Sequence, residues 1–183
     1  KAHGKPHLVG LSLGGSLILK LLEKHSSLID RVIVDGASPQ PIKGYRKIIA
    51  IVYLMSFLKN TKFVANFLTK MMQEDGAPVQ DVQRFVTDFQ RAERRSFRRA
   101  MSQANLLRLD LQFDNPAFFI SGGKEAETIH DWHRRLAQKN VRSECAFYPG
   151  KGHAWLFSDV DTHIQLLRYF FQNAAFPEKL KGF

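Results

Sequence analysis

Apolar residues along this chain alternate between short unbroken runs and longer stretches in which they recur with helical spacing. The unbroken runs, which are typical of buried strands, lie within residues 8–9, 31–36, 116–121 and 144–148. The helical spacing covers residues 14–25, 127–139 and 159–173. Strands that alternate with helices predict an α/β fold, in which a mostly parallel sheet carries helices on both faces.

The spacing also predicts which face of each helix is buried. In the first helix we expect the buried residues to be Leu17, Ile18, Leu21 and Leu22. In the last helix we expect them to be Ile164, Leu167, Phe170 and Phe171, with Leu166 extending the stripe.

Residues 38–108 are too long for a simple connection between a strand and the next helix, and they predict an inserted helical unit. The rest of the chain, 1–37 and 109–183, then forms the core. Within the insertion, residues 48–58 are almost all apolar and are expected to form a helix buried against the core, since they are shorter than the ~20 residues that span a bilayer. Contact with a membrane or lipid is the alternative. Residues 82–89 have helical spacing as well.

The formal net charge of +10 is concentrated in this insertion, where residues 40–108 hold 13 Lys or Arg and 5 Asp or Glu. Five arginines are expected to form one stripe along a single helix, with Phe97, Met101 and Ala104 more nearly opposite; they are Arg91, Arg94, Arg95, Arg98 and Arg99. A solvated helix face is the plain interpretation. An anionic substrate, an acidic lipid surface or an acidic partner are alternatives. Nucleic acid is a poor fit, because no nucleic-acid module is visible.

The composition is that of an ordinary globular domain, with 183 residues, 44% hydrophobic and 24% charged. Cys145 is the single cysteine, so no intrachain disulfide can form, and we expect a cytoplasmic protein with Cys145 as a small core residue. Neither a signal peptide nor an apolar run of transmembrane length is visible.

The candidate chemistry begins at Gly10-Leu11-Ser12-Leu13-Gly14-Gly15, a G-x-S-x-G motif between a predicted strand and a predicted helix. Glycines on both sides of Ser12 remove β-carbons that would clash in a tight turn. The turn exposes the Ser12 hydroxyl, and the backbone N–H of Leu13 at the start of the helix is placed to stabilise an oxyanion.

In this context the motif resembles the nucleophile elbow of the α/β-hydrolase superfamily. The resemblance covers nearly the whole chain and implies that residues 38–108 form a helical lid over the serine. Family members place several strands ahead of the nucleophile, and one of the loops there gives the second oxyanion donor. The chain opens with Lys1, so it resembles the C-terminal part of a hydrolase, and we expect it to expose a sheet edge and to be inactive when isolated.

A serine hydroxyl needs a base, and His153 in the segment Gly150-Lys151-Gly152-His153-Ala154-Trp155 follows the last predicted strand. Its position and its small neighbours match the catalytic-histidine loop of the family. The acid implied by the family follows the penultimate strand, where Glu125 stands in place of the commoner aspartate. Asp35 and Glu127 are the alternative acids.

The remaining histidines carry no comparable motif. His130 and His133 lie three residues apart on a predicted helix, but a third metal ligand at convincing spacing is missing, so we expect a solvated polar face and no metal site. The others without a motif are His3, His7, His25 and His163.

These observations predict a serine hydrolase that cleaves a carboxylic ester or related acyl bond of a small-molecule substrate through an acyl-enzyme on Ser12, without a cofactor. The same fold and triad also serve thioester hydrolysis, carbon–carbon bond cleavage, lyase reactions and perhydrolysis. A binding protein that kept the fold and lost turnover is the alternative outside enzymes, motivated by Glu125 and by the absent strands.

Overall fold

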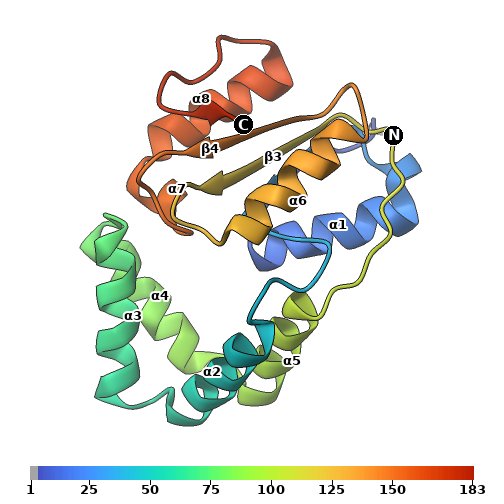
Figure 1. The fold of residues 1–183 in the computed structure, drawn as a ribbon. Coiled ribbons are helices and arrows are strands. Elements are labelled where there is room, and N and C mark those ends of the chain that lie inside the picture. Colours follow the sequence, from blue (N-terminus) through green and yellow to red (C-terminus); the bar gives the residue numbers. More distant parts are fainter. Residues whose placement is uncertain (1–3) are drawn as a thin grey trace.

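Five strands form one sheet, in which each strand lies beside its neighbour in the sequence (Figure 1). The computed structural model describes residues 4–183, so His3 lies outside the described residues. The strands are β1 (Leu8–Leu11), β2 (Val32–Asp35), β3 (Ala117–Gly122), β4 (Glu144–Tyr148) and β5 (Lys181–Gly182). Strands β1 to β4 run parallel and β5 is antiparallel to β4. The predicted α/β fold with a mostly parallel sheet is confirmed.

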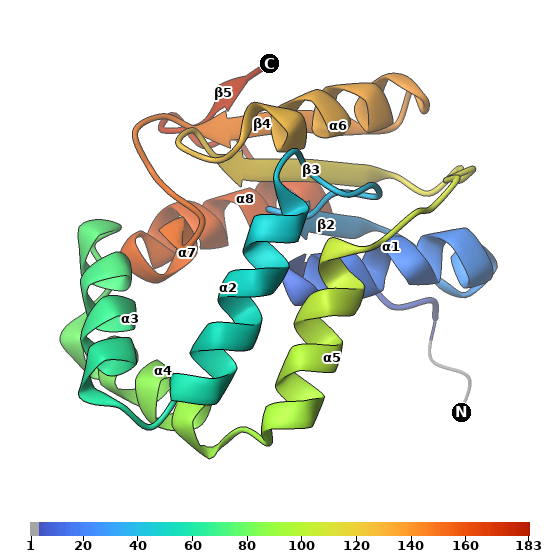
Figure 2. The same cartoon turned by 60° about the horizontal axis from the view of Figure 1, so that its bottom comes forward.

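Helices occupy most of the connections between the strands. The helices of the core are α1 (Leu13–His25), the 3₁₀ turn η1 (Ser26–Leu28), α6 (Glu127–Gln138), α7 (Trp155–Ser158) and α8 (Val160–Gln172). Four further helices lie between β2 and β3, and we call residues 45–105 the helical insertion; they are α2 (Tyr45–Leu58), α3 (Lys62–Glu74), α4 (Val79–Arg91) and α5 (Arg94–Asn105). Figure 2 shows α2 and α5 side by side, with α3 and α4 as a second pair.

Alternating side chains of the central strands build a separate core on each face of the sheet. Val32, Val34 and Phe119 point to the face covered by α1 and α6, where they pack with residues such as Leu19. The neighbouring Ile33, Phe118 and Ile120 point to the opposite face; there they pack with residues of α7 and α8 such as Trp155, Leu166 and Phe170. Both faces of β2 and β3 are therefore buried, which explains their unbroken apolar sequences.

The buried faces of α1 and α8 match the predicted ones only in part, since Ile18, Leu22 and Phe170 are buried as predicted and other predicted positions are not. Leu19 is fully buried, whereas Leu17 is 55% exposed and Leu21 is 39% exposed. In α8 the buried stripe centres on Leu166 and Phe170, and Ile164 is 40% exposed. The spacing gives the period of a helix, but its rotation depends on which neighbouring elements cover it.

Two expectations for the helical insertion were wrong. Helix α2 is not buried against the core, because among its residues only Val52 and Ser56 are buried, while Leu54 is 57% exposed and Phe57 is 71% exposed. Within residues 4–183, no helix combines the length and apolarity that crossing a bilayer requires.

The second correction concerns the arginine stripe, which is split between two helices. Helix α4 ends at Arg91, and α5 begins at Arg94 after Glu93, whose carboxylate accepts hydrogen bonds from the backbone N–H groups of Arg95 and Ser96. An acidic N-cap stabilises a new helix start at this point. Arg91 therefore does not share a helix face with the other four arginines.

The positions of Leu17 and Leu19 give a direct test of the helix rotation. We expect Leu19→Ala to lower the free energy of unfolding by about 2–5 kcal/mol, because it leaves a cavity in the core. The matched Leu17→Ala should change it by no more than about 0.5 kcal/mol, since that side chain is mostly in solvent. Urea denaturation of both variants measures the difference, and equal losses would contradict the described rotation of α1.

Candidate active site

Ser12 stands at the turn between β1 and α1, in a backbone conformation that only tight packing maintains. Its φ of 54° and ψ of −111° lie outside the common regions for a residue with a β-carbon. The turn is fixed on both sides, because the Ser12 N–H donates to the Asp35 carbonyl at 2.8 Å and the Ser12 carbonyl accepts from Ser16 N–H at 2.9 Å. A strained residue at a sharp turn from a strand to a helix is the geometry that the sequence motif predicts.

The glycines of the motif have unequal roles in this turn. A β-carbon on Gly10 would lie 2.5 Å from the Gly14 carbonyl carbon, and one on Gly15 would lie 2.8 Å from the Ala37 β-carbon. A β-carbon on Gly14 would meet open space. The sequence interpretation, which gave the steric role to Gly10 and Gly14, is therefore right for Gly10 and wrong for Gly14.

Leu13 is the first residue of α1, so its N–H belongs to the helix end at which backbone N–H groups have no partner within the helix. The first turn of α1 contains no acidic residue. Its partial positive charge therefore stays available to an anion beside Ser12.

His153 and Glu125 form a hydrogen-bonded pair at the carboxyl ends of β3 and β4. His153 Nδ1 lies 2.8 Å from Glu125 Oε2, and Glu125 Oε1 accepts from the Gly122 N–H at 3.0 Å. The Glu125 side chain is only 5% exposed, whereas that of His153 is 46% exposed. The buried Glu125 carboxylate is thus held by the Gly122 backbone, while the His153 imidazole is partly exposed to solvent.

Gly36, just after β2, makes room for this pair. Its φ is +58°, and a β-carbon at this position would lie 2.7 Å from His153 Cε1 and 3.1 Å from Glu125 Oε1. Only glycine combines this backbone conformation with such a close approach. Sequence reasoning used Gly36 only as the end of a strand, and its place directly after a strand was the available signal.

Ser12, Glu125 and His153 line one cavity of about 420 Å³. Its apolar wall comes from the core, from the connection before α2 and from the helical insertion; it includes Ile42, Ile48, Met101, Ala104 and Ile129. Within residues 4–183, Ser12 Oγ and His153 do not form a hydrogen bond with each other. Such bonds are often long before a substrate binds. The structure therefore brings the three predicted residues to one cavity, beside Leu13.

The pKa of His153 reflects opposing effects. Burial lowers it, but the hydrogen bond and negative charge of Glu125, with the charges of Asp35 and Asp75, outweigh burial and raise the pKa above its usual value. Stabilising the protonated imidazole is what a base requires when it accepts a proton during a reaction.

Asp35, the first alternative acid, lies beneath the pair and is not the partner of His153. Its carboxyl is 1% exposed, and neither of its oxygens has a hydrogen-bond partner of standard geometry among the described residues. Burial and the neighbouring charge of Glu125 raise its pKa well above the usual value, although the nearby Trp155 indole and His153 oppose this.

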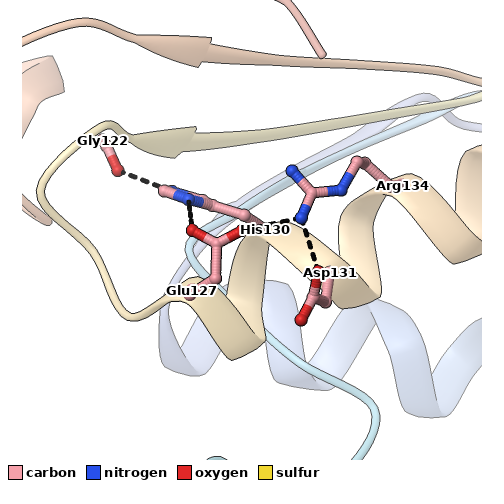
Figure 3. Close-up of polar contacts among 5 residues, drawn as sticks. All are labelled: Gly122, Glu127, His130, Asp131 and Arg134. Carbon is pink, nitrogen blue, oxygen red and sulfur yellow. Dashed lines mark hydrogen bonds and ion pairs between the residues drawn. The ribbon is translucent and has the colours of Figure 1, made fainter.

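Glu127, the second alternative acid, is engaged elsewhere. Figure 3 shows its carboxylate between Arg134 and His130, with contacts of 2.7 Å to Arg134 Nη2 and 3.4 Å to His130 Nδ1. The hydrogen bonds from Arg134 and His130 lower its pKa. The other ring nitrogen of His130 lies 3.1 Å from the Gly122 carbonyl, at the end of β3.

The expectation of a solvated face for His130 and His133 was wrong, because both side chains are buried. His133 is 0% exposed, and its Nε2 lies 3.0 Å from the Ala37 carbonyl. Burial lowers its pKa to about 4. Within residues 4–183, no group of three His, Cys, Asp or Glu is arranged to hold a metal ion.

One further residue near the site escaped the sequence analysis. Asp75, from the helical insertion, accepts hydrogen bonds from the backbone N–H groups of Gly152 and Ala154, on either side of His153. No motif surrounds Asp75, and the separation of 77 residues from Gly152 leaves no local pattern that would have pointed to it.

Comparison with known proteins identifies the family of this chain. A sequence model of the Alpha/beta hydrolase family matches residues 2–162, so the chain belongs to the alpha/beta hydrolase family. Its membership agrees with the parallel sheet and with the elbow at Ser12. No curated protein matches the chain at a significant level.

Several solved structures share the fold. An alpha/beta hydrolase enzyme from a Medee basin deep-sea metagenome library has a TM-score of 0.70 at 17% identity, over 94% of this chain and 66% of its own. A thermophilic esterase from Thermogutta terrifontis has a TM-score of 0.69 at 15% identity, and the match covers 93% of this chain and 65% of the esterase. The enol-lactonase from Burkholderia xenovorans LB400 has a TM-score of 0.64 at 16% identity, and the match covers 92% of this chain and 66% of the lactonase. This chain thus spans about two thirds of the length of these structures.

The contrast between Gly10 and Gly14 yields a prediction for the elbow. We expect Gly10→Ala to lower the free energy of unfolding by roughly 1–3 kcal/mol or more, because its β-carbon must push α1 away from β1. Gly14→Ala should be neutral or stabilising by up to about 1 kcal/mol, as alanine favours helix. Chemical denaturation separates the two, and a larger loss in Gly14→Ala would contradict the described packing.

The buried His133 predicts a loss of stability in mild acid. As the pH falls from 6.5 towards 4, the unfolded chain binds a proton that the folded protein excludes, so stability decreases by up to about 3 kcal/mol across this window. Below the folded pKa both states are protonated and this contribution no longer changes. His133→Gln should flatten the pH dependence of the free energy of unfolding, whereas the exposed control His25→Gln should leave it unchanged. An unchanged pH dependence in His133→Gln would show that His133 is not the source of this loss of stability.

Proposed function

We propose that this chain carries the catalytic machinery of a serine hydrolase that acts on a carboxylic ester or related acyl bond. The observation that carries the proposal is the 2.8 Å contact between His153 and the buried Glu125, in the cavity that Ser12 also lines. A nucleophile, a base and an orienting carboxylate in one cavity are the parts that acyl transfer requires.

In the proposed reaction Ser12 Oγ attacks the carbonyl carbon while His153 takes its proton. Glu125 holds Nδ1, so Nε2 is the nitrogen that receives the proton and later returns it to the leaving group. The Leu13 N–H donates to the oxyanion. Water then attacks the acyl-enzyme and releases the acid, which regenerates Ser12. The residues supply all of these proton transfers without a cofactor.

We propose that residues 38–108, which contain the helical insertion, act as a lid that shapes the substrate pocket. Ile42, Ile48 and Met101 give the cavity an apolar wall, which favours an uncharged acyl group of small-molecule size.

The second oxyanion donor is proposed to come from a strand connection outside this chain, beside β1. The isolated chain is therefore expected to react poorly, and the single Cys145 fits a protein of the cytoplasm.

A fluorophosphonate probe tests the proposal because it reacts covalently with an activated serine. We expect the probe to label Ser12 in a longer polypeptide that also carries the strands that precede the nucleophile in family members. The present chain alone should show little or no labelling. Ser12→Ala should abolish labelling. Glu125→Gln should slow it by at least about tenfold, because the imidazole loses its orienting charge.

The matched control is Glu127→Gln, which removes a carboxylate that contacts His130 and Arg134 instead of His153. It should label at the normal rate, as peptide mass mapping would report. If no folded form labels at Ser12, the hydrolase proposal fails and a binding protein of this fold becomes the better description. A panel of esters, lactones and thioesters then distinguishes the reactions that the fold supports.

A further inference from the structure

Asp75 joins the helical insertion to the loop that carries His153. Its Oδ1 accepts a hydrogen bond from the Gly152 N–H at 3.1 Å, and its Oδ2 accepts one from the Ala154 N–H at 3.3 Å. The two donors flank His153 in the sequence. One carboxylate therefore holds the backbone on both sides of the proposed base, and hydrogen bonds to a charged acceptor are the stronger kind.

The sequence of this loop leaves room for the carboxylate. A β-carbon on Gly152 would lie 2.3 Å from Asp75 Oδ1 and 2.6 Å from Oδ2. Any other residue at this position would displace Asp75 or the loop. A glycine is therefore required before His153 because Asp75, from the helical insertion, occupies the space that a β-carbon would need. This steric role adds to the loop flexibility that the sequence suggested.

Asp75 is itself held firmly, because it ends α3 in a Schellman motif. Gly76, with φ +86°, donates to the Gln73 carbonyl at 2.9 Å, and Ala77 N–H donates to the Met72 carbonyl at 3.0 Å. Met72 and Ala77 are buried together with Val82, and Phe157 of α7 packs against them. The turn that presents Asp75 is therefore fixed to the core beside the His153 loop, where Figures 1 and 2 show the α3–α4 pair next to α7.

We propose that Asp75 is a positioning residue for His153, through which the helical insertion sets the place of the base. This inference rests on the proposed function of His153. By holding the N–H groups of Gly152 and Ala154, Asp75 orients the loop so that Nδ1 meets Glu125. Its negative charge also favours the protonated imidazole, together with that of Glu125 and Asp35.

The charged groups around His153 come from several elements. Glu125 follows β3, Asp35 ends β2 and Asp75 ends α3, while Lys124 lines the same cavity. Lys151, two residues before His153, donates to Ser158 Oγ at 3.1 Å. Among the three carboxylates, Asp75 alone belongs to the helical insertion, so a substitution of Asp75 changes the charge near His153 while the Glu125 and Asp35 side chains stay as they are.

The test uses Asp75→Asn, which keeps the shape and removes the charge, and the matched control Glu74→Gln, which removes an adjacent exposed carboxylate paired with Lys70. In Asp75→Asn we expect amide hydrogen exchange in the peptide 149–155 to accelerate about tenfold or more, because the acceptor is weakened. The NMR titration midpoint of the His153 ring should fall by roughly half a pH unit. The control should match the unmodified protein in both measurements.

A second variant keeps the inference testable if Asp75→Asn fails to fold. Gly152→Ala retains the charge but displaces the carboxylate, and it should give the faster exchange with a smaller shift of the His153 midpoint. In the form that labels at Ser12, Asp75→Asn should also slow labelling several-fold. The acid limb of the pH profile of labelling should move to lower pH, because a base with a lower pKa loses its proton at a lower pH.

The outcomes separate this inference from the proposed function. Normal exchange, an unmoved His153 midpoint and an unmoved acid limb in Asp75→Asn would overturn the positioning role, even if the variant were less stable. Absence of Ser12 labelling in the unmodified protein would overturn the hydrolase proposal instead. In that case the exchange and NMR measurements would still decide whether Asp75 orders the His153 loop.

Discussion

The close approach of β1 to the first turn of α1 is the contact on which the rest of the site depends. The backbone at Gly10 passes so near Gly14 that no side chain fits between them, and this forces Ser12 into its unusual conformation. Core burial on both faces of the sheet supplies the stability that offsets the local strain. If this contact loosened, Ser12 would move away from the cavity that Glu125 and His153 share.

Glu125 and His153, the proposed acid and base, are held by a second arrangement, at the carboxyl ends of β3 and β4. Pairing of Gly122 with Tyr148 aligns the two strand ends. The loops beyond are then joined to each other, because Gly123 N–H donates to the Tyr148 carbonyl at 2.8 Å and Lys124 N–H donates to the Lys151 carbonyl at 2.9 Å. The loops that carry Glu125 and His153 are therefore held to each other, and the parallel sheet brings both to the edge where Ser12 lies.

Much of the fold was predictable from sequence, because buried parallel strands and amphipathic helices leave strong local patterns. The strand at 144–148 has the predicted bounds, and the elbow was visible in six residues. What escaped prediction depends on contacts between distant elements. Leu17 shows apolar helical spacing yet lies in solvent, and His133 is polar yet fully buried, since neighbouring elements decide both. For the same reason Asp75 gave no sign of its contact with the His153 loop.

The sheet has two unlike edges, and this makes its extension directional. At one edge the antiparallel strand β5 is only two residues long, whereas at the other edge the parallel strand β1 has four residues, and its Val9 is 44% exposed. A strand that joins the sheet, from the same polypeptide or another, is thus directed to the β1 side and comes to rest beside the Ser12 turn. Extension of the sheet would therefore also cover one side of the turn that presents Ser12, so that the free edge of the sheet and the surroundings of this serine are parts of one surface.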